Sequence, residues 1–346
     1  MMTAIKKEID IRATELATSA LDSIYFGGGT PSLLDREDLD MIFGALSTHF
    51  TWDQQTEITL EANPDDLTDQ KLKQLSSTEV NRLSIGVQSF HDEDLSYMNR
   101  AHDASEAHRC ITAAQDVGFD AISADLIYGV PTSDDNRWRE NIHKILSYDI
   151  DHISAYALTV EEGTALHHFI AQGKSEPVDD NVSSRQFDIL IDRLEDSGYI
   201  HYEISNFAKP DSYAIHNSNY WLGQPYLGLG PSAHSFDGAH CRSWNIAHNA
   251  RYIKILQQGH LPLESEVLTS VDAFNEYILI RLRTIWGIDR KDIVDQWPEC
   301  LALLDDTSAK FISDGYMAMV DNKYTLTRRG KHLGDKISME LFAEVD

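Results

Sequence analysis

The chain has 346 residues, a length at which one large and one smaller domain are expected. Its residues are 42% hydrophobic and 25% charged, which is ordinary for a globular protein. Its 56 acidic residues outnumber its 29 basic residues and give a net charge of −27, which repels a phosphate backbone and argues against nucleic-acid binding. We expect a cytoplasmic protein without a transmembrane segment, because the sequence has no signal-peptide core and no apolar run of about 18 residues.

The first half of the sequence repeats one pattern: a short apolar strand, a polar turn and an amphipathic helix. Strands are predicted over residues 23–27, 57–61, 82–87, 121–127 and 152–158. Helices are predicted over residues 4–17, 36–49, 69–76, 105–117 and 137–147, and three of them have start signals at Asp35, Thr68 and Ser133. This alternation predicts an α/β fold with a parallel sheet, open or rolled into a barrel. The helix over residues 4–17 has no strand before it, so the pattern begins in the middle of a unit.

The second half of the sequence changes character twice. A polar break at residues 173–181 precedes a predicted helix over 184–196. Residues 199–248 are rich in aromatic residues, Gly and His, which predicts an irregular layer across one end of the barrel. From residue 270, helices lead into two short strands with a turn at Asp321–Asn322, the pattern of a winged-helix-like domain. We therefore expect a barrel core over 1–198, a closing segment over 199–262 and a C-terminal domain over 263–346.

The sharpest local signal is IYFGGGTPSL at residues 24–33, where three consecutive glycines follow a predicted strand. Three glycines in a row lose much conformational entropy on folding, so they need a structural reason. Either the chain turns tightly as it leaves the strand, or the backbone must let a ligand approach closely. The spacing and the lysine of a P-loop are missing, so a nucleotide loop of that kind is excluded.

Polar side chains stand near the carboxyl ends of three predicted strands. Alternation along each strand places Glu61, Gln88 and Asp125 on the face opposite the apolar residues. In βα barrels, ligands bind at the carboxyl ends of the strands. Polar turns explain one such residue easily and three less well, so these residues indicate a binding site.

At this point the sequence resembles a known family. The segments YFGGGTPSLL, EITLEANPDDLT, NRLSIGVQSFHDEDLSYMNRAH, ISADLIYGVP and HISAYALTVEEGT, in this order, resemble the core of oxygen-independent coproporphyrinogen oxidase-like radical SAM proteins. HNSNYW at residues 216–221, followed by YLGLGPSAHSF, is similar to the HemW haem chaperones in particular. The resemblance covers essentially the whole chain. It implies a partial, N-terminally truncated parallel (β/α)6-type barrel with a small helical, winged-helix-like C-terminal domain.

The resemblance also implies a site for S-adenosylmethionine (SAM). Its contacts would be Gly28, Gly29, Thr30, Glu61, Gln88, Arg100 and Asp125. The Arg100 guanidinium suits a carboxylate, and the two acidic residues supply acceptors for an ammonium group or ribose hydroxyls. For Arg100 a second interpretation stays open, that of a solvated cation at a helix end.

The sequence departs from the family in its cysteines. Family members hold a [4Fe–4S] cluster with a CxxxCxxC loop, whereas Cys110, Cys241 and Cys300 are isolated and form no such motif. We therefore predict no metal ligands, no catalytic residues and no oxidase activity for this chain. Two explanations stay open: a missing N-terminal stretch that carries the motif, which we favour because the SAM contacts remain, or a natural relative without a cluster.

For function, the resemblance implies a haem chaperone that passes haem to respiratory acceptor proteins at the membrane. Candidate haem contacts are His216, Tyr220, Trp221 and His234, in the aromatic segment. The alternatives are an oxygen-independent coproporphyrinogen III oxidase-like enzyme of porphyrin biosynthesis, and a binding module without catalysis.

Overall fold

The computed structural model describes residues 1–344, and the chain divides into two compact units. The barrel unit consists of residues 23–36 and 56–214. The terminal unit consists of residues 1–22, 37–55 and the chain from residue 215 onward. The domain boundaries expected from the sequence stay a prediction.

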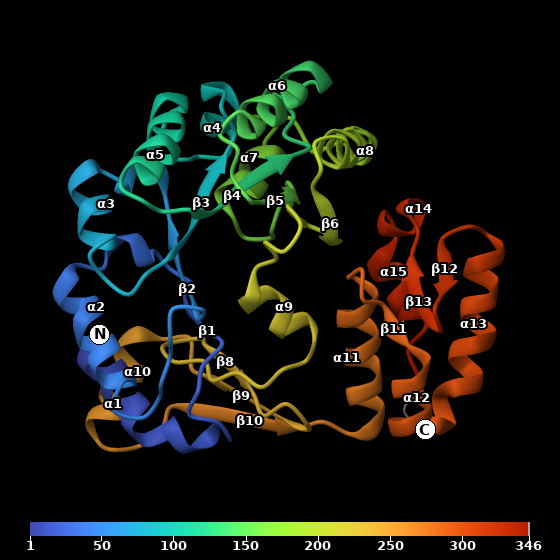
Figure 1. The fold of residues 1–346 in the computed structure, drawn as a ribbon. Coiled ribbons are helices and arrows are strands. Elements are labelled where there is room, and N and C mark those ends of the chain that lie inside the picture. The colour runs from blue at the N-terminus through green and yellow to red at the C-terminus, as the bar shows by residue number, and fades with distance from the viewer. Residues whose placement is uncertain (345–346) are drawn as a thin grey trace. The chain divides into compact units, whose positions relative to one another are not determined.

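The barrel unit is built on a seven-stranded sheet with the order β1-β2-β3-β4-β5-β7-β6 (Figure 1). The first five strands are parallel: β1 (Ser23–Phe26), β2 (Glu57–Ala62), β3 (Arg82–Gln88), β4 (Ala121–Tyr128) and β5 (His152–Ala157). The last two, β6 (Ile200–Glu203) and β7 (Asn206–Ala208), form a hairpin that joins β5 through antiparallel pairing with β7. The α/β fold with a partial parallel barrel is confirmed.

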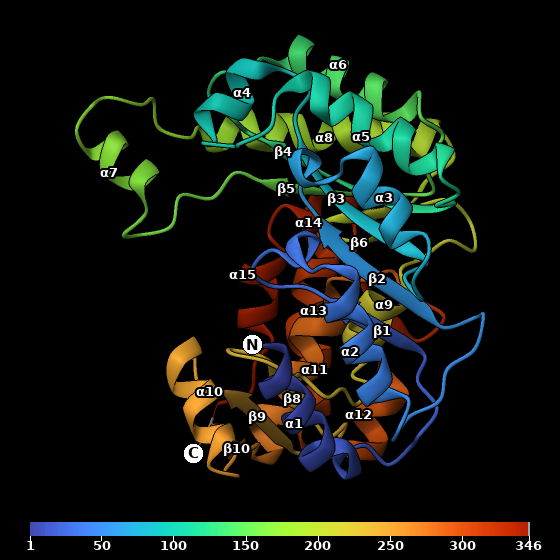
Figure 2. The same cartoon turned by 90° about the vertical axis from the view of Figure 1, so that its left-hand side faces the viewer.

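Helices cover the apolar face of this sheet. Figures 1 and 2 show α3 (Asp69–Leu75), α4 (Asp92–Tyr97), α5 (Ala104–Asp116), α6 (Asp135–Leu146) and α8 (Asp180–Asp196) along one side of the strands. The side chains beneath them are fully buried, as at Leu60, Leu83 and Ile122. Helix α7 (Ala165–Ala171) stands away from the sheet on long loops (Figure 2). The polar side chains of the strands therefore share the other, concave face.

The first part of the terminal unit brings together the chain's first helix and residues more than 200 positions later. It contains α1 (Met2–Arg12), a 3₁₀ turn (Ala13–Glu15), α2 (Arg36–Leu46), α9 (Ile215–Trp221), α10 (Asn249–Gln257), and a sheet of β8 (His234–Phe236), β9 (Cys241–Asn245) and β10 (Leu263–Val267). Glu8 and Arg12 on α1 are fully buried and form an ion pair of 3.0 Å. Arg12 donates to the Gly228 carbonyl and to Ser235, while Glu8 accepts from Asn245 and Tyr252. This network fixes α1 to β8, β9 and α10.

The second part of the terminal unit has its own apolar core and a three-stranded antiparallel sheet. Its elements are α11 (Ser270–Leu282), β11 (Ile288–Asp289), α12 (Arg290–Gln296), α13 (Leu301–Ser313), β12 (Met317–Val320), β13 (Lys323–Leu326), α14 (Arg328–Lys331) and α15 (Gly334–Glu340). Asp321 and Asn322 both have positive φ, 50° and 64°, as a two-residue hairpin turn requires. The predicted helices and strand pair of a winged-helix-like domain are confirmed.

The structure corrects several sequence-based boundaries. Helix α1 ends at Arg12 instead of residue 17, because Glu15 folds back onto the Arg12 guanidinium in a tighter turn. The cap of α6 is Asp134 and not Ser133, since the Asp134 carboxylate accepts from the backbone N–H groups of the first turn. Helix α8 begins at Asp180, four residues before the predicted start. The segment 199–248 is not an irregular layer throughout, since it supplies strands β6 to β9.

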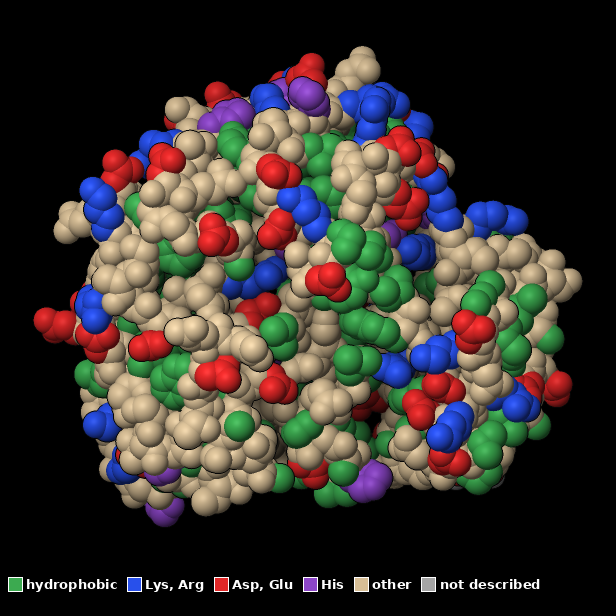
Figure 3. All heavy atoms as spheres, viewed as in Figure 1, with side chains coloured by type: hydrophobic (Ala, Val, Ile, Leu, Met, Phe, Trp, Pro, Cys, Tyr) green, Lys and Arg blue, Asp and Glu red, His purple; other side chains and the backbone are tan. Residues whose placement is uncertain are grey.

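On the face drawn in Figure 3, acidic side chains are scattered among basic and apolar ones and gather into no single patch. Among residues 1–344 no helix combines the length and the apolar character needed to cross a bilayer.

Candidate functional site

Glycine occurs at the three positions after β1 for two different reasons, a close contact at Gly27 and a positive φ at Gly28 and Gly29. At Gly27 a Cβ atom would lie 2.4 Å from a ring carbon of Tyr25 and 2.9 Å from the Glu61 carboxylate, so only glycine fits. Gly28 and Gly29 have φ of +69° and +73°, and a Cβ on either would meet nothing within 4 Å. The loop is thus a tight strand exit whose last two glycines face open space.

Glu61, near the end of β2, forms hydrogen bonds with β1 and with the glycine loop that follows it. Its Oε1 accepts a hydrogen bond of 2.7 Å from the Tyr25 hydroxyl, and its Oε2 accepts one of 3.1 Å from the Gly28 N–H. The carboxylate lies on the concave face, as the alternation of residues along β2 predicted. Thr30 follows in the same exposed loop, directly before Pro31.

Gln88 and Arg100 meet above Gly86 on β3. The pairing of β3 with β4 shifts register between Ile85 and Gln88, and Gln88 has a positive φ of 64°. A Cβ on Gly86 would lie 2.9 Å from the Gln88 amide nitrogen and 3.3 Å from the Arg100 guanidinium. Arg100 is therefore not a solvated helix-end cation, since its side chain turns onto the sheet and donates to Asn63 at 2.9 Å.

The Arg100 side chain also carries an orphaned donor. Its Nε is buried and has no hydrogen-bond partner within residues 1–344. A buried guanidinium nitrogen without a partner is costly, and a carboxylate is the group that best satisfies it. This observation fits the carboxylate of an amino-acid ligand at this place.

Asp125, on β4, completes the group on the concave face. Burial, together with the nearby Glu61 carboxylate, raises the pKa of Asp125 to about 7, against the opposing effects of hydrogen bonds from Ser154 and Ser84 and of the charge of Arg100. These interactions place Glu61, Arg100 and Asp125 within electrostatic reach of one another. The structure thus brings together the strand-end residues that the sequence singled out.

Several neighbours of this group were missed at the sequence level. Tyr25, Asn63, Ser84 and Ser154 all contact it, and Tyr156 interacts with both carboxylates. Tyr25 and Tyr156 could have been found, because the alternation that selected Glu61 also places them on the concave face of β1 and β5. Asn63 lies beyond the strand, where alternation carries no information.

A second group of polar side chains lies on the same face, nearer the amino ends of the strands, and its members contact one another. Arg82 contacts Glu57 at 3.5 Å and donates to Ser123 at 2.6 Å. Ser123 in turn contacts His152, whose other ring nitrogen lies 2.8 Å from the Tyr202 hydroxyl. These polar contacts link the five strands β2 to β6, and we assign them to the scaffold.

The haem candidates lie in the terminal unit. Tyr220 and Trp221 on α9 are in edge-to-face contact with ring centroids 5.0 Å apart, and His216 is one helical turn before Tyr220. The Tyr220 ring continues to Tyr226 at 5.7 Å. His234 is exposed on β8 and its ring lies over Trp244 at 6.1 Å.

Two strands therefore extend the aromatic pair of α9 into a larger surface. Tyr226 contacts Phe236, which shares a face of β8 with His234. We call Tyr220, Trp221, Tyr226, Phe236, His234 and Trp244 the aromatic surface. Tyr226, Phe236 and Trp244 were not among the sequence candidates. The pairing of β8 with β9 sets Trp244 beside His234, and an isolated bridge sets Tyr226 beside Phe236.

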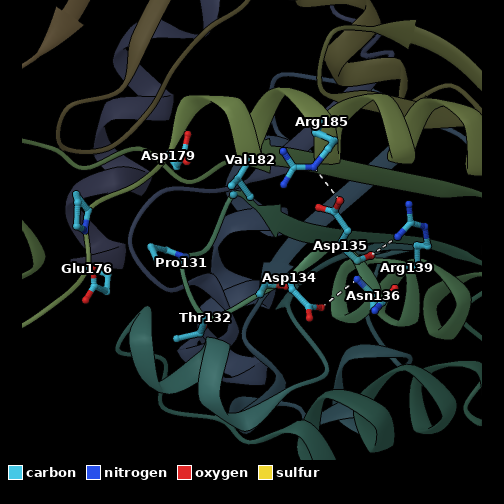
Figure 4. Close-up of a pocket in the computed structure, with 13 residues that line it drawn as sticks. Pro131, Thr132, Asp134, Asp135, Asn136, Arg139, Glu176, Asp179, Val182 and Arg185 are labelled. Carbon is cyan, nitrogen blue, oxygen red and sulfur yellow. Dashed lines mark hydrogen bonds and ion pairs between the residues drawn. The ribbon is translucent and has the colours of Figure 1, made fainter.

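A pocket of about 690 Å³ lies elsewhere in the barrel unit, between the loop after β4 and the starts of α6 and α8 (Figure 4). None of the predicted site residues lines it. Three of its carboxylates are engaged within the chain: Asp134 and Asp179 cap the two helices, and Asp135 pairs with Arg185 at 2.8 Å. We do not assign the site to this pocket.

The three cysteines are divided between the two units. Cys110 is buried on α5, its thiol donates to the Ala107 carbonyl, and burial raises its pKa to about 12. Cys241 and Cys300 belong to the terminal unit. Within residues 1–344 no group of three or more His, Cys, Asp or Glu side chains could hold a metal ion.

Comparison with known proteins decides the family. The model of the radical SAM superfamily matches residues 4–145. The heme chaperone HemW of Mycobacterium tuberculosis (strain H37Rv) is 30% identical over 337 residues, which cover 97% of this chain and 84% of that protein. HemW of Bacillus subtilis (strain 168) is also 30% identical and covers 97% and 89%. The chain belongs to the HemW family of radical SAM proteins.

A solved structure supports the fold of this HemW-family chain. Coproporphyrinogen III oxidase (HemN) of Escherichia coli, a radical SAM enzyme, superimposes with a TM-score of 0.83 over 99% of this chain and 82% of its own. The two sequences are 23% identical, so this likeness concerns the fold alone. The resemblance stated from the sequence is confirmed.

Proposed function

We propose that this protein is a haem chaperone that binds haem and passes it to respiratory acceptor proteins at the membrane. The observation that carries the proposal is the similarity to proteins named heme chaperone HemW along 97% of the chain. The aromatic surface supports it, because a flat hydrophobic macrocycle gains about 1 kcal/mol per well-placed ring beyond the burial of its area. The acceptor proteins and a cytoplasmic location are part of this proposal.

The barrel unit, in the same proposal, binds SAM on its concave face. Gly28, Gly29 and Thr30 contact the amino-acid end through the exposed loop, and Glu61 accepts from its ammonium group. Arg100 meets the carboxylate with its orphaned Nε. Gln88 and Asp125 complete the contacts from β3 and β4. SAM, when bound, supplies an adenosyl group on a sulfonium; we derive no step through an iron–sulfur cluster, because the cysteines of this chain do not assemble one.

Haem titration of the purified chain tests the proposal. We expect about one equivalent of haem to bind, and His216→Ala to change the Soret band, because His216 is the axial ligand in this proposal. His260→Ala, an exposed histidine of the same unit, is the matched control and leaves the spectrum unchanged. We expect no conversion of coproporphyrinogen III in the same preparations. Normal binding with an unaltered spectrum in His216→Ala would remove His216 as the ligand, and turnover of the porphyrinogen would favour the oxidase.

A further inference from the structure

We propose that Tyr25 is a positioning residue that fixes the Glu61 carboxylate for the ammonium group of an amino-acid ligand. This inference rests on the SAM site proposed above and adds a residue to it. Tyr25 donates to one Glu61 oxygen at 2.7 Å, and the Gly28 N–H donates to the other at 3.1 Å. Because each oxygen is held by one donor, the plane of the carboxylate is set before any ligand arrives, and each oxygen keeps a lone pair for an incoming donor.

The position of the Tyr25 ring is itself fixed by the glycine loop. A Cβ at residue 27 would lie 2.4 Å from the ring and 2.9 Å from Glu61, so the absence of a side chain at Gly27 makes room for the contact. Pairing of β1 with β2 sets Tyr25 opposite Thr59, two residues before Glu61 on the same face of β2. The phenol therefore reaches Glu61 along the diagonal between the two strands.

The chemistry of a phenol suits this task. Burial and the Glu61 charge both raise the pKa of Tyr25, so the hydroxyl remains a donor at every ordinary pH. A lysine or arginine in the same place would neutralise Glu61. A tyrosine orients the carboxylate and leaves its negative charge available to an ammonium group.

Two related ligands separate this role from a general structural one. S-adenosylhomocysteine carries the α-amino acid group, and 5′-methylthioadenosine is the same adenosyl thioether without it. Both are titrated into the full chain in wild-type form and as Tyr25→Phe. We expect the variant to bind S-adenosylhomocysteine about tenfold more weakly and 5′-methylthioadenosine with unchanged affinity, because loss of one charge-assisted hydrogen bond weakens only the ammonium contact.

Two further variants sharpen the test. Tyr199→Phe removes a buried tyrosine hydroxyl that donates to the Ile150 carbonyl elsewhere in the barrel unit, and it should leave both affinities unchanged. In a Glu61→Gln background, Tyr25→Phe should cause no further loss for S-adenosylhomocysteine, because the two residues act through one contact. If Tyr25→Phe fails to fold, Tyr25→Leu takes its place, since it removes the same hydroxyl and adds no side chain beside Glu61.

The outcomes distinguish this inference from the function on which it rests. If wild type binds S-adenosylhomocysteine and Tyr25→Phe leaves that affinity unchanged, or weakens both ligands equally, the role of Tyr25 is refuted and the SAM site stands. If wild type does not bind S-adenosylhomocysteine, the SAM site is refuted, and the role of Tyr25 with it.

Discussion

Asp125 illustrates what a concave polar face does to a single side chain. Strand β4, which carries Asp125, lies between β3 and β5 in the sheet, and burial together with the nearby Glu61 carboxylate raises the pKa of Asp125 to about 7. In the folded protein the group thus takes up a proton at a pH where the same side chain in an unfolded chain is ionised. The sequence located this residue by alternation, but its titration depends on neighbours from other strands.

The shift in Asp125 predicts how stability depends on pH. Between the unfolded pKa of 3.8 and about 7 the folded state binds the extra proton, so the contribution of Asp125 to stability declines as the pH rises through this range. We expect Asp125→Asn, which removes the charge, to gain about 2–4 kcal/mol relative to wild type on going from pH 4 to pH 8. Urea unfolding at both pH values measures this, with the exposed Asp120→Asn as control. Equal effects of Asp125→Asn at the two pH values would contradict the shifted pKa.

Individual residues show where prediction from the sequence ends. Alternation along strands placed Glu61 and Asp125 correctly, because their strands are regular. It could not foresee the left-handed backbone of Gln88, which depends on the register shift between β3 and β4. Nor could it foresee that Arg100 turns onto the sheet, since this requires Gly86 to leave space for the guanidinium.

At the scale of elements, the sequence predicted the strands and the turn that depend on residues close together along the chain. The five parallel strands were predicted within one residue at their ends, and the wing turn at Asp321–Asn322 was placed correctly. The hairpin of β6 and β7 was missed because its strands have four and three residues, too short for a periodicity to appear. Its pairing with β5 is a tertiary contact.

Helix α1 provides a test of buried charge. Arg12→Ala leaves the fully buried Glu8 without its ionic partner, and we expect a loss of about 3–5 kcal/mol in the free energy of unfolding. The double variant Glu8→Gln/Arg12→Met should recover part of this loss, because no unpaired charge remains. Chemical denaturation followed by circular dichroism measures both, and Lys6→Ala, exposed on the same helix, serves as control. If the double variant is as unstable as Arg12→Ala, lost packing and not the unpaired charge causes the effect.

At the scale of the whole molecule, the distribution of the cysteines between the two units bears on cluster binding. Cys110 is buried in the barrel unit, whereas Cys241 and Cys300 belong to the terminal unit. We expect anaerobic incubation of this chain with iron and sulfide to leave it without a four-iron cluster, because a cuboidal cluster needs thiolates that converge on one point. Iron and sulfide analysis after desalting measures the loading, and Cys110→Ser should behave as wild type. Four irons per chain that survive desalting would contradict the prediction.

The division of the chain between the two units also has a consequence for the order of events during synthesis. The chain passes from one unit to the other four times, and residues 1–22 pack with the segment that begins at residue 215. The partners of Glu8 and Arg12, from Gly228 to Tyr252, leave the ribosome long after α1 has been made. Contacts so distant in sequence form slowly. Helix α1 therefore reaches its native place only after residues 228–252 have been made, and until then the side chains of Glu8 and Arg12 remain in water.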